Sequence, residues 1–180
     1  MLRQPLIPHP DAPHPEIALT AEIARTGPRA LQVQFQISGA MRQIEYPTRA
    51  RHERADELWR HTCFELFLKV PDSGYREFNF SPSMQWAAYA FSDYRSGMVP
   101  LHVEAPRMEL NRDLRPDRLS VWVTLDPAVP TDLAWRVGLS AVIEDRRGRR
   151  SYWALAHPPG KPDFHHPDCF TLELPAARQI

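Results

Sequence analysis

Hydrophobic and polar side chains alternate along several short stretches of the chain. Residues 31–38, LQVQFQIS, carry an apolar side chain at every second position and place a glutamine between each pair. The same period of two recurs at 118–126 and at 133–145. Such alternation is typical of a strand that buries one face and exposes the other. We therefore predict half-buried strands at these three places.

Shorter apolar runs, separated by turn residues, predict further strands at 17–25, 61–70, 75–81, 85–91, 101–110, 151–157 and 169–174. Pro-Asp-Ser-Gly at 71–74 and Gly148 are turn signals between neighbouring strands. Residues 49–59 are charged and lack an apolar stripe, so we interpret them as a loop with at most a short helix. About ten mostly antiparallel strands without a long helix indicate an all-β fold, a β-sandwich. The alternative, an α+β fold, would need a helix across 51–67.

Proline is unusually frequent, with 19 residues among 180, roughly twice the average share of ~5%. Because helix interiors and central strands exclude proline, this favours many turns and edge segments. Four prolines fall before residue 14, and we divide the chain into a Pro-rich N-terminal arm (1–16), one domain (17–175) and a C-terminal tail (176–180).

Charge and hydropathy limit the partners that we expect. Lys and Arg together number 22, as do Asp and Glu, and no basic cluster lies on a nucleic-acid-binding motif. The chain lacks an apolar run of the roughly 20 residues that a membrane helix needs, and its N-terminus does not resemble an export signal. We expect a cytoplasmic protein that binds neither nucleic acid nor membrane. Nothing in the sequence indicates its oligomeric state.

A row of polar side chains follows the predicted meander 61–70, 75–81 and 85–91. Turn positions predict that Glu65 lies opposite Asn79, that Phe67 lies opposite Glu77, and that Asn79 lies near Ala88. One face then forms the sandwich core: Phe64, Leu66, Leu68, Phe78, Phe80, Ala87, Tyr89 and Phe91. The other face collects His61, Cys63, Glu65, Glu77, Asn79, Ser81, Trp86, Ala88 and Ala90. Acids, an amide, an aromatic ring and small alanines together suit a polar ligand with one stackable face.

The strand predicted at 133–145 adds Arg136, Gly138 and Ser140 opposite its apolar positions, and we include Arg136 among the candidate ligand-binding residues. A structural role for the polar row is the alternative. Long loops could cover it, with the acids paired to Arg76 or Arg95, because buried polar groups need partners. Arg95 is therefore a candidate in either case.

Two motifs carry a resemblance to a known family. They are Glu65-Leu66-Phe67, an E-x-F strand, and Tyr75-Arg76-Glu77-Phe78-Asn79-Phe80-Ser81-Pro82, a strand that begins Y-x-E-F and ends in proline. In these residues the chain resembles the bacterial DOMON-like proteins, whose fold is shared with family 9 carbohydrate-binding modules. The resemblance extends over most of residues 17–174.

The resemblance implies a β-sandwich that binds sugar or haem. In sugar-binding relatives aromatic rings clamp the saccharide, and the aromatic candidates by residue type are Trp59, Trp86, Tyr94 and Trp153. In haem-binding relatives Met and His hold the iron. Met84, Met98 and His157 have the right side chains, but no motif pairs any two of them, so we expect no cofactor. We favour a non-catalytic domain that binds a small polar ligand, a saccharide, and retain haem binding as an alternative.

Two further kinds of site were considered. An enzyme could use Glu65 and Glu77, which would lie on neighbouring strands, but no local signature supports catalysis. The segment HPPGKPDFHHPDC (157–169) is rich in metal-ligand residue types, yet its spacing matches no zinc motif. We therefore assign neither catalytic nor metal-binding residues.

Overall fold

The computed structural model describes residues 1–69, 74–111 and 117–176. Within these ranges the chain forms strands β1 (Leu2–Pro8), β2 (Ile17–Gly27), β3 (Ala30–Gly39), β4 (Cys63–Lys69), β5 (Tyr75–Phe80), β6 (Trp86–Phe91), β7 (Val99–Pro100), β8 (Arg107–Asn111), β9 (Arg118–Leu125), β10 (Trp135–Glu144), β11 (Arg150–Ala154) and β12 (Leu172–Leu174). Three short 3-10 helices, η1 (Met41–Gln43), η2 (Leu58–Arg60) and η3 (Pro167–Cys169), complete the described elements.

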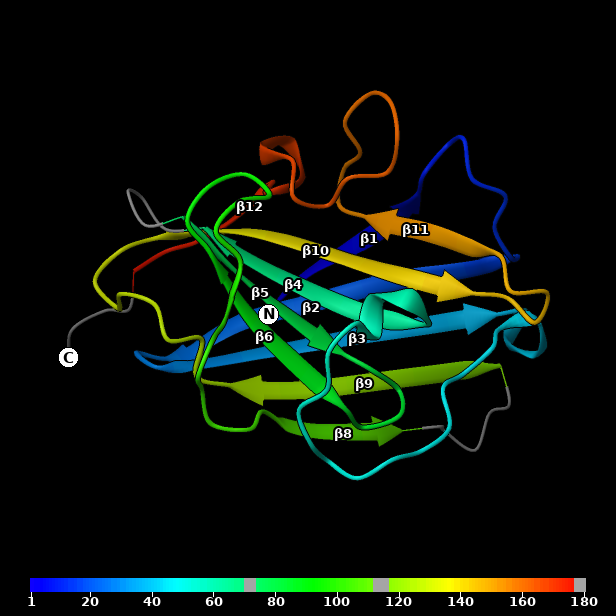
Figure 1. Cartoon of the computed structure of the whole chain (residues 1–180), viewed down its shortest axis with the longest axis horizontal. Helices are drawn as coiled ribbons and strands as arrows, with labels where there is room; N and C mark the ends of the chain where they lie inside the picture. The colour runs from blue at the N-terminus through cyan, green and yellow to red at the C-terminus, as the bar shows by residue number, and fades with distance from the viewer. Residues whose placement is uncertain (70–73, 112–116, 177–180) are drawn as a thin grey trace.

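The strands form two layers. Sheet A has the order β1-β2-β3-β9-β8, and sheet B has the order β7-β6-β5-β4-β10-β11, with β12 paired to β10. In Figure 1 the two sheets lie one over the other, with sheet B toward the viewer. Every pair of named strands in the described ranges is antiparallel. The predicted all-β sandwich is confirmed.

Strand β1 joins the two layers. Its first residues pair with β2 in sheet A, from Leu2 with Ile23 to Leu6 with Leu19. Its last residues pair with β11 in sheet B, Ile7 with Ala154 and Pro8 with Trp153. Residues 1–16 were predicted to be an arm outside the domain, and the structure places the first half of that segment in the sheets.

The core lies between the layers, where the alternating strands turn their apolar sides toward each other. Leu31, Val33, Phe35 and Ile37 of β3 are fully buried, as are the inward residues of β10. The rings of Phe35 and Phe64 stack with centroids 5.0 Å apart. Burial of these side chains supplies most of the free energy that favours folding.

Element boundaries differ from the predictions at several places. The strand predicted at 101–110 is shorter, because β8 begins at Arg107 and the pair β6–β7 accounts for Val99 and Pro100. The last strand covers only Leu172–Leu174, since residues 167–169 form η3. The predicted turn at 71–74, except for Gly74, and the end of the tail (177–180) lie outside the described residues.

One register prediction is right and the next is wrong by one residue. Glu65 lies opposite Asn79 and Phe67 opposite Glu77, as predicted. Asn79, however, lies opposite Ala87 rather than Ala88. The turn between β5 and β6 pairs Ser81 with Gln85 through its backbone, and Met84 takes a left-handed conformation with φ of 82°. A shift of one residue exchanges the faces of a strand. Trp86 and Ala88 therefore face the core, and Ala87, Tyr89 and Phe91 face outward.

No helix in the described ranges is long and apolar enough to span a membrane.

The core assignment can be tested on one buried and one exposed aromatic residue. Phe64 is fully buried between the sheets, whereas Trp122 is 39% exposed on the outer face of sheet A. We expect Phe64→Ala to lower the free energy of unfolding by about 3–5 kcal/mol. We expect Trp122→Ala to change it by about 0.5 kcal/mol or less, as is usual for surface sites. Urea denaturation measures both, and equal losses would contradict the core assignment.

Candidate functional site

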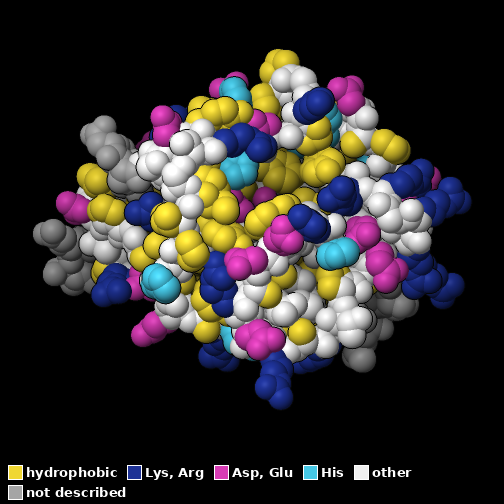
Figure 2. Space-filling view, viewed as in Figure 1, with side chains coloured by type: hydrophobic (Ala, Val, Ile, Leu, Met, Phe, Trp, Pro, Cys, Tyr) yellow, Lys and Arg dark blue, Asp and Glu magenta, His cyan; other side chains and the backbone are white. Residues whose placement is uncertain are grey.

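The outer face of sheet B carries a second apolar cluster, separate from the sandwich core. It comprises Phe67, Tyr75, Ala87, Tyr89, Phe91, Val142, Ala154, Phe164 and Phe170, all buried. Phe164 and Phe170 come from the segment 155–171, which connects β11 to β12 and packs on this face. Figure 2 shows the face with hydrophobic side chains gathered at its centre among basic, acidic and histidine side chains.

The sheet determines why the segment 155–171 lies there. β11 and β12 pair with the same edge of β10, at Ser140–Glu144 and Trp135–Val137 respectively, so the segment between them must arch beside β10. It approaches the sheet closely at Gly138, where an added Cβ would lie 3.3 Å from the Cys169 carbonyl oxygen and 3.4 Å from the Phe67 Cβ. A glycine at this position permits the contact.

A cavity of ≈ 450 Å³ lies between the sheet and its covering segments. The lining residues are Trp59, Glu65, Glu77, Phe91, Arg95, Met98, Val142, Arg150, Tyr152, Pro162, Phe164 and His165. Glu65 of β4 and Glu77 of β5 are buried and form its acidic floor. Trp59 and Tyr152, both half-buried, contribute aromatic walls, and the exposed Met98 and Arg150 lie at the rim.

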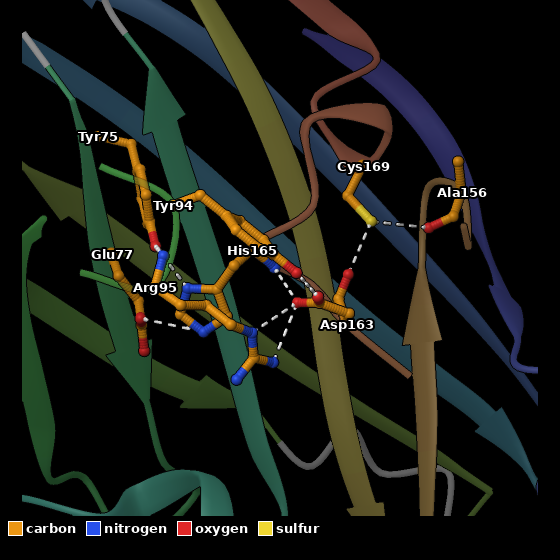
Figure 3. Close-up of polar contacts among 8 residues, drawn as sticks. All are labelled: Tyr75, Glu77, Tyr94, Arg95, Ala156, Asp163, His165 and Cys169. Atoms are coloured by element: carbon orange, nitrogen blue, oxygen red, sulfur yellow. Dashed lines mark hydrogen bonds and ion pairs between the residues drawn. The ribbon is translucent and has the colours of Figure 1, made fainter. Parts of the chain in front are cut away.

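An ion pair ties two of the covering segments together. Nε and Nη2 of Arg95 donate to Oδ1 of Asp163 at 3.1 and 3.0 Å, and the Tyr94 hydroxyl donates to Oδ2. Figure 3 shows both side chains converging on Asp163. Burial alone would raise the pKa of the Asp163 carboxyl, but these hydrogen bonds lower it overall. The β6–β7 loop is thereby fixed to the segment 155–171.

A chain of polar contacts runs from this ion pair to the floor. The Arg95 backbone N–H donates to the Tyr75 hydroxyl at 3.2 Å, and that hydroxyl lies 2.8 Å from Nδ1 of His165. The Tyr75 hydroxyl can donate to Nδ1 or accept from it, depending on the tautomer of the imidazole. Nε2 faces Oε2 of Glu77 at 3.9 Å, and Oε1 of Glu77 accepts from Asn79 Nδ2 at 2.8 Å. Figure 3 shows His165 between Tyr75 and Glu77.

Burial sets the protonation of this cluster. Burial, followed by the charge of Arg95, lowers the pKa of His165 to about 4, so the imidazole is neutral at pH 7. Burial raises the pKa of Glu77 to about 7, although Asn79 and Arg95 favour its ionised form. Burial and the charge of Glu77 both raise the pKa of Glu65 well above its usual value. Two neighbouring carboxyls therefore compete for ionisation near neutral pH.

The structure brings half of the predicted site residues together. Glu65, Glu77 and Arg95 line the cavity. Asn79, fully buried, supports Glu77 from below, and Tyr94 supports the covering segment through Asp163.

The other predicted site residues lie elsewhere. Trp86 and Trp153 are core residues between the sheets, which corrects their assignment to the ligand face. His61 precedes β4 and contacts Glu144 at 2.7 Å. Arg136 donates to the Phe170 carbonyl at 3.0 Å. His157 contacts the Ile7 carbonyl at 2.9 Å and lines a different cavity. These five side chains do not line the cavity above Glu65.

The haem candidates are not brought to one place either. Met98 lies at the rim of the cavity, His157 lines another cavity, and Met84 packs against the sandwich core. Among the residues that the structure describes, no group of three or more His, Cys, Asp or Glu side chains is arranged to hold a metal ion.

Sequence reasoning missed several lining residues. Phe91 was predicted on the core face and Val142 was not assigned, whereas both line the cavity. Phe164 and His165 lie in the segment 157–169, to which the sequence assigned no site residue other than His157. The dense run of His, Asp and Pro at 157–169 was the available signal that this loop is structured. Its packing on sheet B follows from tertiary contacts, which a local pattern does not contain.

Comparison with known proteins addresses the fold. Neither a protein-family profile nor a curated protein sequence matches the chain. Among solved structures, a protein from Bacteroides uniformis that has been proposed to bind carbohydrate is similar with a TM-score of 0.65 and 16% identity, over 94% of this chain and 84% of that one. A family 9 carbohydrate-binding module from Caldicellulosiruptor kristjanssonii, in complex with cellotriose, is similar with a TM-score of 0.59 and 12% identity, over 98% and 84% of the two chains.

The chain has the fold of family 9 carbohydrate-binding modules. A module of this family in complex with glucose, from the same Caldicellulosiruptor species, is also similar, with a TM-score of 0.51 and 10% identity over 82% of this chain and 71% of that one. At identities this low, the structural similarity shows the shared fold alone.

The buried carboxyls predict a pH-dependent stability. Because folding raises the pKa of Glu65 and Glu77, the folded state holds more protons than the unfolded state from pH ~4.5 upward, and stability falls as pH rises to ~7. His165, whose pKa folding lowers to about 4, acts in the opposite direction. We therefore compare wild type with the double variant Glu65→Gln/Glu77→Gln, since both proteins retain His165.

We expect wild type to lose on the order of 2–4 kcal/mol relative to the double variant between pH 4.5 and 7.5. Asp163, whose pKa is lowered, titrates below this window and does not contribute. Urea denaturation at several pH values measures the difference. Parallel stability curves for the two proteins would show that the carboxyls are not buried as described.

Proposed function

We propose that this chain is a non-catalytic carbohydrate-binding domain and that a small saccharide binds in the cavity above Glu65 and Glu77. The observation that carries this proposal is the combination of an acidic floor and aromatic walls around ≈ 450 Å³. Pockets of about 300–1,000 Å³ are the usual size for small-molecule ligands. The saccharide complexes of two proteins with this fold support the same ligand class.

A saccharide presents two kinds of surface, and the cavity offers a partner for each. Its hydroxyl groups need hydrogen-bond partners once they leave water. Glu65 and Glu77 can accept from them, and the guanidinium nitrogen of Arg95 that Asp163 does not engage can donate. Its C–H faces pack on aromatic rings, for which Trp59 and Tyr152 are placed at the walls. We also propose, from the two sequence motifs, that the chain is related to the DOMON-like proteins.

Binding can be measured by isothermal titration calorimetry with glucose, cellobiose and cellotriose. We expect at least one of these sugars to bind to wild type. Removing a stacking wall with Trp59→Ala should weaken that binding by about tenfold or more, which corresponds to ~1.4 kcal/mol. Trp122→Ala, which removes an exposed indole from the outer face of sheet A, is the matched control and should bind like wild type. If none of the sugars binds, or if both variants lose affinity equally, the proposed site is wrong.

One observation favours a second candidate, an acid–base enzyme that acts on a saccharide. Glu65 and Glu77 are neighbouring carboxyls whose pKa values burial raises, so one can be protonated while the other is ionised. Glycosidases use such a pair, one carboxyl as acid and the other as nucleophile or base.

Hydrolysis of nitrophenyl glycosides separates the two candidates. A binding domain should show no turnover while it still binds sugar in calorimetry. An enzyme should show a bell-shaped pH profile, and Glu65→Gln and Glu77→Gln should each reduce turnover by at least about a hundredfold. We favour the non-catalytic binding domain, so we expect no turnover above the uncatalysed rate.

A further inference from the structure

One oxygen of the cavity floor lacks a donor. Oε1 of Glu65 is buried, and no hydrogen-bond donor reaches it from the part of the chain that the structure describes. Ser140 lies directly opposite on β10, close enough to favour the ionised carboxylate, but its hydroxyl is not in hydrogen-bond geometry. Glu77 differs, since Asn79 donates to it. A donor for Glu65 must therefore come from solvent or from a ligand.

The charged groups around Glu65 do not supply a cation either. Those that lie near it are Cys63 of β4, Glu77 of β5, Arg95 of the β6–β7 loop, Arg150 of β11 and His165 of the segment 155–171. Arg95 is engaged by Asp163, and Arg150 is exposed at the rim of the cavity. His165 directs its Nε2 toward Glu77 rather than Glu65. In the described part of the chain, no cationic side chain is within hydrogen-bond reach of Oε1 of Glu65.

We propose that the preferred ligand is an amino sugar, whose ammonium group donates to Glu65 while its ring packs on the aromatic walls; this inference rests on the proposed function of the cavity. An ammonium group carries three donors and no acceptor, and it complements a carboxylate that already lacks a donor. Hydrogen bonds between charged partners are shorter and stronger than those between neutral ones. A hydroxyl group of a neutral sugar could donate to Oε1 of Glu65, but it would not compensate the negative charge of the carboxylate.

Because burial and Glu77 raise the pKa of Glu65, binding of an ammonium group is linked to the release of a proton. A bound ammonium stabilises the ionised carboxylate, so a Glu65 that was protonated releases its proton to solvent on binding. Neutral sugars produce no such release. The preference for the amine should therefore increase from pH 5 to pH 7.

The test compares D-glucosamine, D-glucose and N-acetyl-D-glucosamine by titration calorimetry at pH 7. The acetylated sugar keeps the nitrogen but loses the charge, so it controls for size and hydrogen bonding. We expect glucosamine to bind wild type at least tenfold more tightly than either neutral sugar. Titrations in buffers of different ionisation enthalpy should show that the protein releases protons when glucosamine binds. Glu65→Gln should reduce the glucosamine-to-glucose ratio to about two or less.

Glu144→Gln is the matched control, because Glu144 lies on β10 beside His61 and does not line the cavity. It should keep the wild-type ratio. A thermal melt verifies that each variant is folded, and the pH dependence of the wild-type ratio gives a readout that needs no variant.

The outcomes distinguish the two proposals. If the sugars bind with equal affinity, or if the glucosamine preference persists in Glu65→Gln or is lost equally in Glu144→Gln, the amine inference is wrong and the saccharide site stands. If none of these three sugars binds, and neither cellobiose nor cellotriose binds, the proposed function fails and the inference fails with it. If cellobiose or cellotriose binds but none of these three sugars does, only the amine inference is wrong.

Discussion

The central strands of sheet B carry large apolar side chains on both faces, and this constraint shapes the rest of the molecule. Phe64, Leu66 and Leu68 of β4 pack into the sandwich, while Phe67 on the same strand points outward with Tyr89 and Phe91 of its neighbours. A sheet of this kind needs cover on two sides. Sheet A covers one face, and the segment 155–171 covers the other. The cavity is the part of the outer face that this cover leaves open.

Polar groups in such a place are costly, and most of those around the cavity have a recognisable compensation. Asp163 holds Arg95, Tyr75 holds His165, and Asn79 holds Glu77. Networks of this kind are rigid when every member is satisfied. Oε1 of Glu65 differs, because it is buried at the cavity without a donor. The contacts of Asp163 and His165 keep the covering segment in place and leave this oxygen unpaired within the described residues.

The sequence contains the strands and part of the site, but not the assembly of the site. Alternation located β3, β9 and β10 and their inward faces, because each strand packs one side against the core. The pairing of Glu65 with Asn79 followed from the turn before β5. The next pairing was wrong by one residue because the turn, in which Met84 is left-handed, is one residue shorter than the prediction required, and this places Trp86 in the core. His165 lies far along the chain from the floor that it contacts, and no local pattern connects the two.

β11 and β12 both pair with one edge of β10. The strand pairing that forms the fold is therefore separate from the segment 155–171, which shapes the cavity. The two strands fix both ends of the covering segment, and its path between them crosses only the outer face. Insertions or deletions within that segment would change the depth and chemistry of the cavity while every strand kept its partner. Loops of this kind tolerate length changes at a small entropic cost. The scaffold can accordingly host different ligand preferences in related chains by varying one connection.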